Sequence, residues 1–114
     1  MPRWLRNLIV YGLLVAGAVI YFGDSSKSHI NKGVDYFNQG NYREAEAEFQ
    51  KAIKQDPDKP IGHYNLATIY CRQKQWQKAA DELNITLDLD PDYPNAEDLL
   101  IDVEVQIDAL PEPE

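Results

Sequence analysis

The chain repeats itself at a period of 34 residues, because residues 26–59 and 60–93 fall into register when one is laid over the other. Small and aromatic residues occupy the shared positions. Both segments end in nearly the same short sequence, DPDKP at 56–60 and DPDYP at 90–94. The register residues are Gly33, Tyr36, Ala45, Phe49, Ala52 and Pro57 in the first segment, and Ala67, Tyr70, Ala79, Leu83, Thr86 and Pro91 in the second. A period of this length indicates stacked supersecondary units rather than one globular core.

This pattern resembles the tetratricopeptide repeat, whose unit is a helix–turn–helix of 34 residues. The resemblance covers residues 26 to about 110 and implies an all-α fold, a short α-solenoid. Repeat 1 is expected at 26–59, repeat 2 at 60–93 and a capping helix at 94–110, so that the repeat domain spans 27–110 after a linker at 24–26. At the positions of the family's early Trp and Leu stand His29 and Lys32 in repeat 1, and His63 and Leu66 in repeat 2.

Helical periodicity divides each repeat into two helices. The first hairpin is predicted at 27–38 and about 41–55, with Gly40 in the turn and Asn41 opening the second helix in a capping box with Glu44. The second hairpin is predicted to begin at Pro60 or Ile61, and its second helix to run over 76–88. In the last helix, about 95–109, an apolar stripe that ends at Leu110 is expected to face the preceding hairpin. The polar residues 111–114 are expected to be disordered.

Residues 4–22 are apolar except for Arg6 and Asn7, and their length is close to the ~20 residues that cross a bilayer. The sequence therefore predicts a transmembrane anchor at 1–23 that enters the lipid bilayer through residues 4–22. Arg3 and Arg6 favour a cytoplasmic N-terminus, with the repeats on the opposite, periplasm-like side. The reverse orientation, with a cytoplasmic or stromal repeat domain, is the alternative. A cleaved signal peptide is disfavoured because residues 19–23 are bulky.

A small-residue spacing inside this segment, Gly12 and Ala16, suggests a weak homodimer through the anchor.

In tetratricopeptide proteins, partners usually lie in the groove lined by the first helix of each hairpin. The resemblance therefore implies a protein or extended peptide as partner, and it places the groove at Lys27, Ile30, Asn31, Val34, Asn38, Tyr64, Asn65, Thr68, Arg72, Asp98 and Asp102. The family includes a clamp for C-terminal carboxylates, built on Lys and Asn in the first helix and Asn in the next. Asn65 matches it, but Ile30 and Val34 stand where the Lys and Asn belong, so a clamp is not expected.

Charge is placed unevenly along the chain. The net charge is −8, and from Pro94 onward there are seven acidic residues and no Lys or Arg. Such a surface repels phosphate backbones, which argues against nucleic acid as a partner. It suits either a solvated end or the docking of a basic partner. Ile101 and Val105 lie one turn apart, opposite the apolar stripe of the last helix, and form a candidate docking edge.

The sequence predicts no catalytic residue, no cofactor, no metal site and no enzyme activity. His29 and His63 share one repeat position, and no carboxylate pair converges on either. Cys71 is expected to be a partly buried, unreactive thiol, although Arg72 beside it could lower its pKa.

The expected function is that of a membrane-anchored interaction scaffold. Small anchored proteins of this build resemble assembly factors of multi-subunit membrane complexes, of the photosystem or cytochrome type. A stable accessory subunit of such a complex is one alternative. A secreted, soluble adaptor left after signal-peptide cleavage is another.

Overall fold

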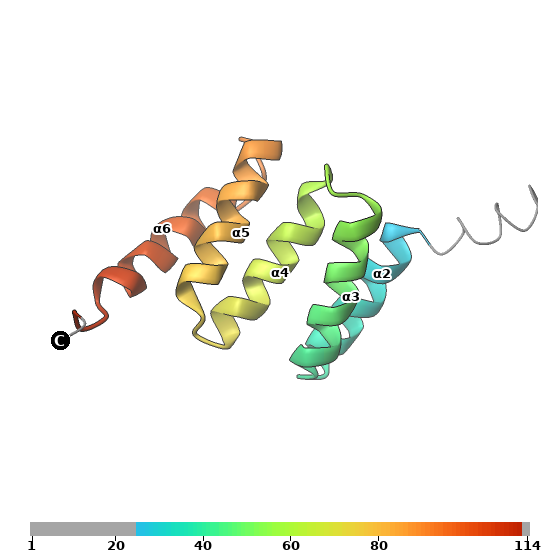
Figure 1. The fold of residues 1–114 in the computed structure, drawn as a ribbon, viewed down its shortest axis with the longest axis horizontal. Helices are drawn as coiled ribbons and strands as arrows, with labels where there is room; N and C mark the ends of the chain where they lie inside the picture. Colours follow the sequence, from blue (N-terminus) through green and yellow to red (C-terminus); the bar gives the residue numbers. More distant parts are fainter. Residues whose placement is uncertain (1–24, 113–114) are drawn as a thin grey trace, which may run out of the picture.

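A computed structural model describes residues 25–112 of the chain. In this part the fold contains helices and no strand, and successive helices are stacked side by side along one direction (Figure 1). The helices are α2 (Ser26–Asn38), α3 (Tyr42–Gln55), α4 (Pro60–Arg72), α5 (Trp76–Leu89) and α6 (Ala96–Asp108). The predicted arrangement of two helical hairpins and a capping helix is therefore confirmed.

The predicted anchor, its orientation and the Gly12/Ala16 spacing all lie outside the described residues. Within residues 25–112, no helix is both long enough and apolar enough to cross a membrane.

Each hairpin is held together by a small residue of its first helix that lies against a large residue of its second. In the first hairpin, a Cβ atom added to Gly33 would lie 2.4 Å from Cε1 of Phe49, so only glycine fits without a shift of the ring. The second hairpin has Ala67 and Leu83 at the same repeat positions, and both are fully buried. The first hairpin thus combines the smallest residue with a large aromatic side chain, whereas the second combines alanine with the smaller leucine.

The turn inside each hairpin has the same hydrogen-bond pattern. Gly40 N–H donates to Phe37 O and Asn41 N–H to Tyr36 O, and the second hairpin repeats this with Lys74 N–H to Cys71 O and Gln75 N–H to Tyr70 O. This is a Schellman motif, which needs a residue in the left-handed region after the helix. Gly40 has φ 79° and Lys74 has φ 58°.

The capping box predicted at Asn41 is not formed. Asn41 is the N-cap residue of α3, and its carbonyl oxygen accepts a hydrogen bond from Ala45 N–H. Its side chain makes no cap hydrogen bond. Its side-chain amide instead donates to Gln39 Oε1 at 3.2 Å. The Schellman turn places the Asn41 backbone with φ −84° and ψ 68°, outside the extended conformation typical of a capping residue.

We expect Lys74→Gly to stabilise the fold. A non-glycine residue at positive φ costs about 1 kcal/mol of stability. Glycine at position 74 removes this cost, because it has no Cβ atom. The free energy of unfolding, measured by urea denaturation followed by circular dichroism, should rise by roughly 0.5 to 1 kcal/mol. The matched change Gly40→Ala, at the equivalent turn of the first hairpin, should lower it by a similar amount. A loss of stability in Lys74→Gly, or no loss in Gly40→Ala, would contradict the turn assignment.

The two histidines that replace the family tryptophan each pair with a glutamate of the second helix. Nδ1 of His29 lies 2.7 Å from Glu48 Oε2, and Nδ1 of His63 lies 2.7 Å from Glu82 Oε2. Nε2 of His63 lies 3.2 Å from the carbonyl oxygen of Pro57. These histidine–glutamate contacts join the two helices of each hairpin in place of aromatic packing, and no pattern in the sequence predicts them.

Two carboxylates in the first repeat have lowered pKa values. Burial raises the pKa of Glu48, but the hydrogen bonds and charge interactions with His29 and Lys51 together lower it by more than burial raises it. The net shift of the pKa is therefore downward. At Asp56, the hydrogen bond from the Ser26 hydroxyl is the main cause, followed by that from Lys59. Both groups therefore favour the folded state when they are ionised.

Acid is consequently expected to destabilise the fold. A carboxylate whose folded pKa is lowered contributes stability above its unfolded pKa of about 4, and loses it as the pH falls through the folded value. The melting temperature should therefore be steady from about pH 7 to 5 and fall below about pH 4. Glu48→Gln should lower the melting temperature at pH 7 and make its fall in acid shallower. An unchanged acid slope in this variant would contradict the role of Glu48.

The capping helix α6 packs against α5. Ala96 and Val103 are buried, and Leu99, Leu100 and Ile107 pack partly against the core. The prediction for Leu110 was wrong, because its side chain is 55% exposed. Because α6 ends at Asp108, Leu110 lies outside the helix and does not continue its apolar stripe.

Candidate functional site

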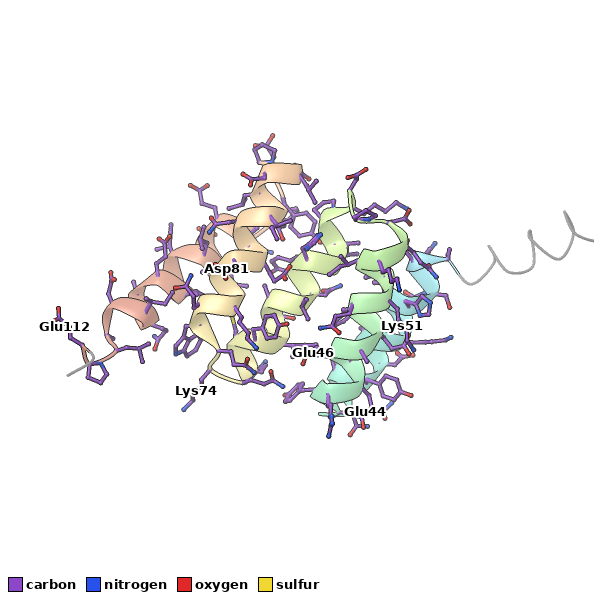
Figure 2. The ribbon with its side chains drawn as sticks, in the orientation of Figure 1. Glu44, Glu46, Lys51, Lys74, Asp81 and Glu112 are labelled. Atoms are coloured by element: carbon purple, nitrogen blue, oxygen red, sulfur yellow. The ribbon has the colours of Figure 1, made fainter. Side chains whose placement is uncertain are left out.

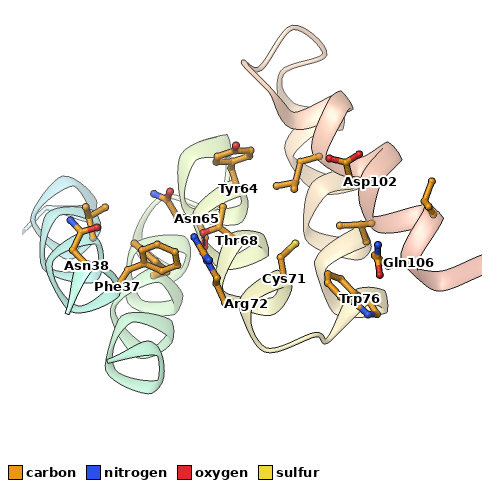
Figure 3. Close-up of a pocket in the computed structure, with 15 residues that line it drawn as sticks. Phe37, Asn38, Tyr64, Asn65, Thr68, Cys71, Arg72, Trp76, Asp102 and Gln106 are labelled. Carbon is orange, nitrogen blue, oxygen red and sulfur yellow. Dashed lines mark hydrogen bonds between the residues drawn. The ribbon is translucent and has the colours of Figure 1, made fainter. Parts of the chain in front are cut away.

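A concave groove of about 820 Å³ runs along the first helices of the two hairpins and the capping helix (Figure 3). It is lined by Val34, Phe37, Asn38, Phe49, Tyr64, Asn65, Thr68, Cys71, Arg72, Trp76, Leu99, Asp102, Val103, Val105 and Gln106. Phe49 and Val103 are almost fully buried and form its floor, and the other residues reach it from α2, α4, α6 and the start of α5.

The 34-residue repeat builds this groove as three columns of equivalent positions. Each column takes one residue from α2, one from α4 and one from α6. The columns are Val34, Thr68 and Asp102; Phe37, Cys71 and Val105; and Asn38, Arg72 and Gln106. Equivalent positions of stacked helices face the same side, so the sequence repeat becomes a regular surface that can follow an extended chain.

The groove has an apolar wall. Phe37 and Trp76 provide aromatic surface, and Val34, Leu99 and Val105 continue the wall with aliphatic side chains. Tyr64 is packed against Tyr93 from the turn before α6, with ring centroids 4.9 Å apart. Tyr93 thereby fixes the position of the Tyr64 ring at the groove.

Polar groups lie among these apolar side chains, with few charges. Asn38, Asn65 and Gln106 bring side-chain amides, which can both donate and accept hydrogen bonds. The guanidinium of Arg72 lies 5.9 Å from the centroid of the Phe37 ring, and this cation–π contact holds it across the groove. The charged lining residues are Arg72 and Asp102, so the lining has no net charge.

Seven of the predicted positions are brought together in the groove. They are Val34, Asn38, Tyr64, Asn65, Thr68, Arg72 and Asp102. That they bind a partner stays a prediction.

Four other predicted groove positions lie elsewhere. Lys27 and Asn31 are exposed on the first half of α2, and neither is among the lining residues. Ile30 is 7% exposed and belongs to the core. Asp98 lines a separate shallow hollow beside the turn at Pro91–Asn95.

The candidate docking edge is divided between two surfaces. Val105 lines the groove, whereas Ile101 does not, although both side chains are exposed.

Sequence reasoning missed several lining residues: Phe37, Cys71, Trp76, Leu99 and Gln106. Phe37 and Leu99 are apolar at helical spacing and also pack partly against the core, so their sequence positions do not distinguish them from core residues. The signal that finds most of them is the repeat period itself. Shifting Asn38 by 34 residues gives Arg72, and a second shift gives Gln106.

Cys71 is half-buried in the groove, and its burial raises the pKa of the thiol above the ordinary value. The lowering that Arg72 could have caused is therefore not found, because the guanidinium is directed to the Phe37 ring. A raised pKa disfavours the thiolate, which is the reactive form. Within residues 25–112, no group of three or more His, Cys, Asp or Glu side chains is arranged to hold a metal ion.

Comparison with known proteins agrees with this architecture. The family model described as tetratricopeptide repeat matches residues 30–94, more than half of the chain. The chain therefore belongs to the tetratricopeptide repeat family, whose fold is a protein-interaction module. Among solved structures it is similar to the first tetratricopeptide domain of Spaghetti (RPAP3), which was solved bound to the HSP90 peptide SRMEEVD. The two share 27% identity with a TM-score of 0.71, over 75% of this chain and 69% of that one. No curated protein matches the chain.

Proposed function

We propose that this protein is a membrane-anchored scaffold that holds a segment of a partner protein in its groove while a multi-subunit membrane complex is assembled. The observation that carries the proposal is the three-column groove, which offers both apolar surface and hydrogen-bonding amides from three helices. The similar domain of Spaghetti, which was solved with a bound peptide, supports a peptide as the occupant.

The lining chemistry defines the segment that fits. Apolar side chains of the segment pack beside Phe37, Trp76 and Val105, because these residues belong to the apolar wall. The amides of Asn38 and Asn65 hydrogen-bond its backbone, which an extended peptide leaves unpaired. Arg72 takes a carbonyl or carboxylate oxygen. The partner segment is therefore extended, rich in apolar residues and close to neutral.

An acidic C-terminal peptide fits this groove less well. Recognition of a terminal carboxylate needs a concentration of cationic and amide donors, whereas here Ile30 is buried in the core and Val34 presents an aliphatic side chain. Asp102 also repels an acidic segment. The recognition mode of this chain therefore rests on apolar contacts and amides rather than on a charged terminus.

We expect the acidic peptide SRMEEVD to bind this protein weakly and without using its C-terminal carboxylate. Isothermal titration of the full-length chain with the free and the C-terminally amidated peptide should give affinities that differ by less than about twofold, because no charge-assisted bond to the terminus is lost. A tenfold or larger loss on amidation would contradict the assignment of the groove chemistry.

The membrane part of the proposal is supported by the apolar segment at residues 4–22. Two measurements test it. Native membranes that contain the tagged protein are solubilised in a mild detergent, and the mass of the purified chain is measured by mass spectrometry. An assembly scaffold predicts an intact N-terminus, residence in the membrane fraction and a partner recovered in less than equimolar amount. Equimolar recovery through every purification step would instead favour a permanent subunit, and a mass lacking residues 1–22 would favour a secreted adaptor.

A further inference from the structure

Helix α6 carries two exposed branched side chains, Ile101 on its outer face and Val105 at the edge of the groove. Ile101 is 52% exposed and Val105 is 58% exposed, and they lie one helical turn apart. With Leu110, which is 55% exposed beyond the end of α6, they are the three most exposed large hydrophobic residues in the part of the chain that the structure describes. Figure 1 places α6 at the C-terminal end of the helical stack.

The repeat register shows what kind of element covers this face elsewhere. Ile101 corresponds to Gly33 in α2 and to Ala67 in α4. Each of those helices packs against the second helix of its hairpin, and Gly33 lies directly on Phe49 of α3. The equivalent face of α6 is therefore a helix-packing face, and residues 109–112, which follow α6, form no helix.

The isoleucine changes the spacing that this face accepts. A single added carbon at Gly33 already collides with the Phe49 ring, at 2.4 Å from Cε1. Ile101 projects several carbons from the same position, so a helix seated on it must lie farther out or present a small residue there. The face is thus shaped for a helix that differs from the second helix of a repeat.

Charge identifies the helix further. Residues 79–114 contain no Lys or Arg, and Ile101 is surrounded on α6 by Glu97, Asp98, Asp102, Glu104 and Asp108. A second copy of this chain would bring the same acidic surface against it, so like charges oppose a symmetric dimer through α6. A helix with basic residues beside its apolar stripe is complementary both to the exposed Ile101 side chain and to the acidic residues around it.

We propose that the outer face of α6 is a second docking surface, which takes an amphipathic helix of a partner protein with Lys or Arg beside its apolar stripe. The helix packs on Ile101 and pairs its basic residues with the acidic residues of α6. This surface adjoins the groove at Val105, but the inference does not depend on what the groove binds.

The probe for this proposal is an 18-residue synthetic helix with a leucine stripe and lysine at its other positions, labelled with fluorescein. Its binding to the full-length chain is followed by fluorescence anisotropy at low salt. We expect it to bind at least about tenfold more tightly than the same peptide with glutamate in place of lysine, and to lose affinity as salt is added. Ile101→Ser should weaken it by about tenfold, the effect of losing one buried aliphatic side chain.

Three further variants keep the test specific. Ile85→Ser, at an isoleucine of α5 that is 39% exposed, is the matched control and should leave binding unchanged. Glu104→Lys should weaken binding through charge alone, without removing an apolar contact. Thr68→Trp, which fills the groove, should have no effect.

Several results would overturn the proposal. They are equal loss of binding in Ile101→Ser and Ile85→Ser, equal affinity for the glutamate peptide, or loss of binding in Thr68→Trp, which would place the probe in the groove. A dimer of the full-length chain that Ile101→Ser dissociates, detected by analytical ultracentrifugation, would show that a second copy covers the face instead.

Discussion

Gly33→Ala is expected to lower the free energy of unfolding by about 2 kcal/mol, although alanine is the better helix former. A Cβ at this position would lie within 3 Å of three atoms of the Phe49 ring. That ring is 1% exposed and cannot move into solvent. The strain of overpacking therefore exceeds the roughly 1 kcal/mol that helix propensity returns. Urea denaturation followed by circular dichroism measures the difference.

The second hairpin supplies the compensating change. Ala67 and Leu83 fill the positions that Gly33 and Phe49 fill in the first hairpin. Phe49→Leu alone leaves a cavity and should cost about 1 to 2 kcal/mol. The double variant copies the second hairpin, so it should be more stable than the sum of the two losses by about 1 to 2 kcal/mol. Simple additivity of the two changes would mean that the contact between residues 33 and 49 is not what fixes the hairpin.

Thr68→Trp is expected to reduce the affinity for the groove partner by about 100-fold or more, equivalent to ~2.7 kcal/mol. Thr68 is the middle residue of one column, and Arg72 lies one turn farther along α4 (Figure 3). An indole there occupies the space through which an extended segment must pass. The measurement is the amount of partner recovered with the tagged protein from detergent-solubilised membranes.

The control for this variant is Asp81→Trp, at an exposed position of α5 that does not line the groove (Figure 2). It adds the same aromatic surface to the molecule and should leave partner recovery unchanged. Asn38→Trp, at an exposed groove position, provides a second blocking variant that does not touch the core. If both blocking variants keep the partner and also the melting temperature of the parent, the groove is not its binding site.

The fold could be predicted from the sequence because its information is local and repeated. Gly40 in the turn, the proline at the end of each repeat and the small residues at 33, 45, 67 and 79 fix the hairpins through backbone geometry and close packing. Lys74 is the residue at which local rules mislead, since the Schellman turn holds a lysine at positive φ. The histidine–glutamate pairs were missed because they join residues 19 positions apart across two helices.

The groove was predicted in part, for a related reason. The repeat period gives which positions of the three helices are equivalent, so Asn38, Arg72 and Gln106 follow from one another. It does not give the twist between successive hairpins, which decides the helical turns that face the groove. On α2 only the second half contributes, and Lys27 and Asn31 therefore fall outside. Ile30 points into the core beneath them.

The central claim is that a partner segment lies along the three columns of the groove. Photocrosslinking tests it most directly, with a photoreactive amino acid placed in turn at positions 38, 106 and 81 of the full-length chain in native membranes. The groove account predicts that positions 38 and 106, at the two ends of one column, crosslink to the same partner at sites a few residues apart, and that position 81 does not. Crosslinks from position 81 alone, or from 38 and 106 to unrelated proteins, would contradict it.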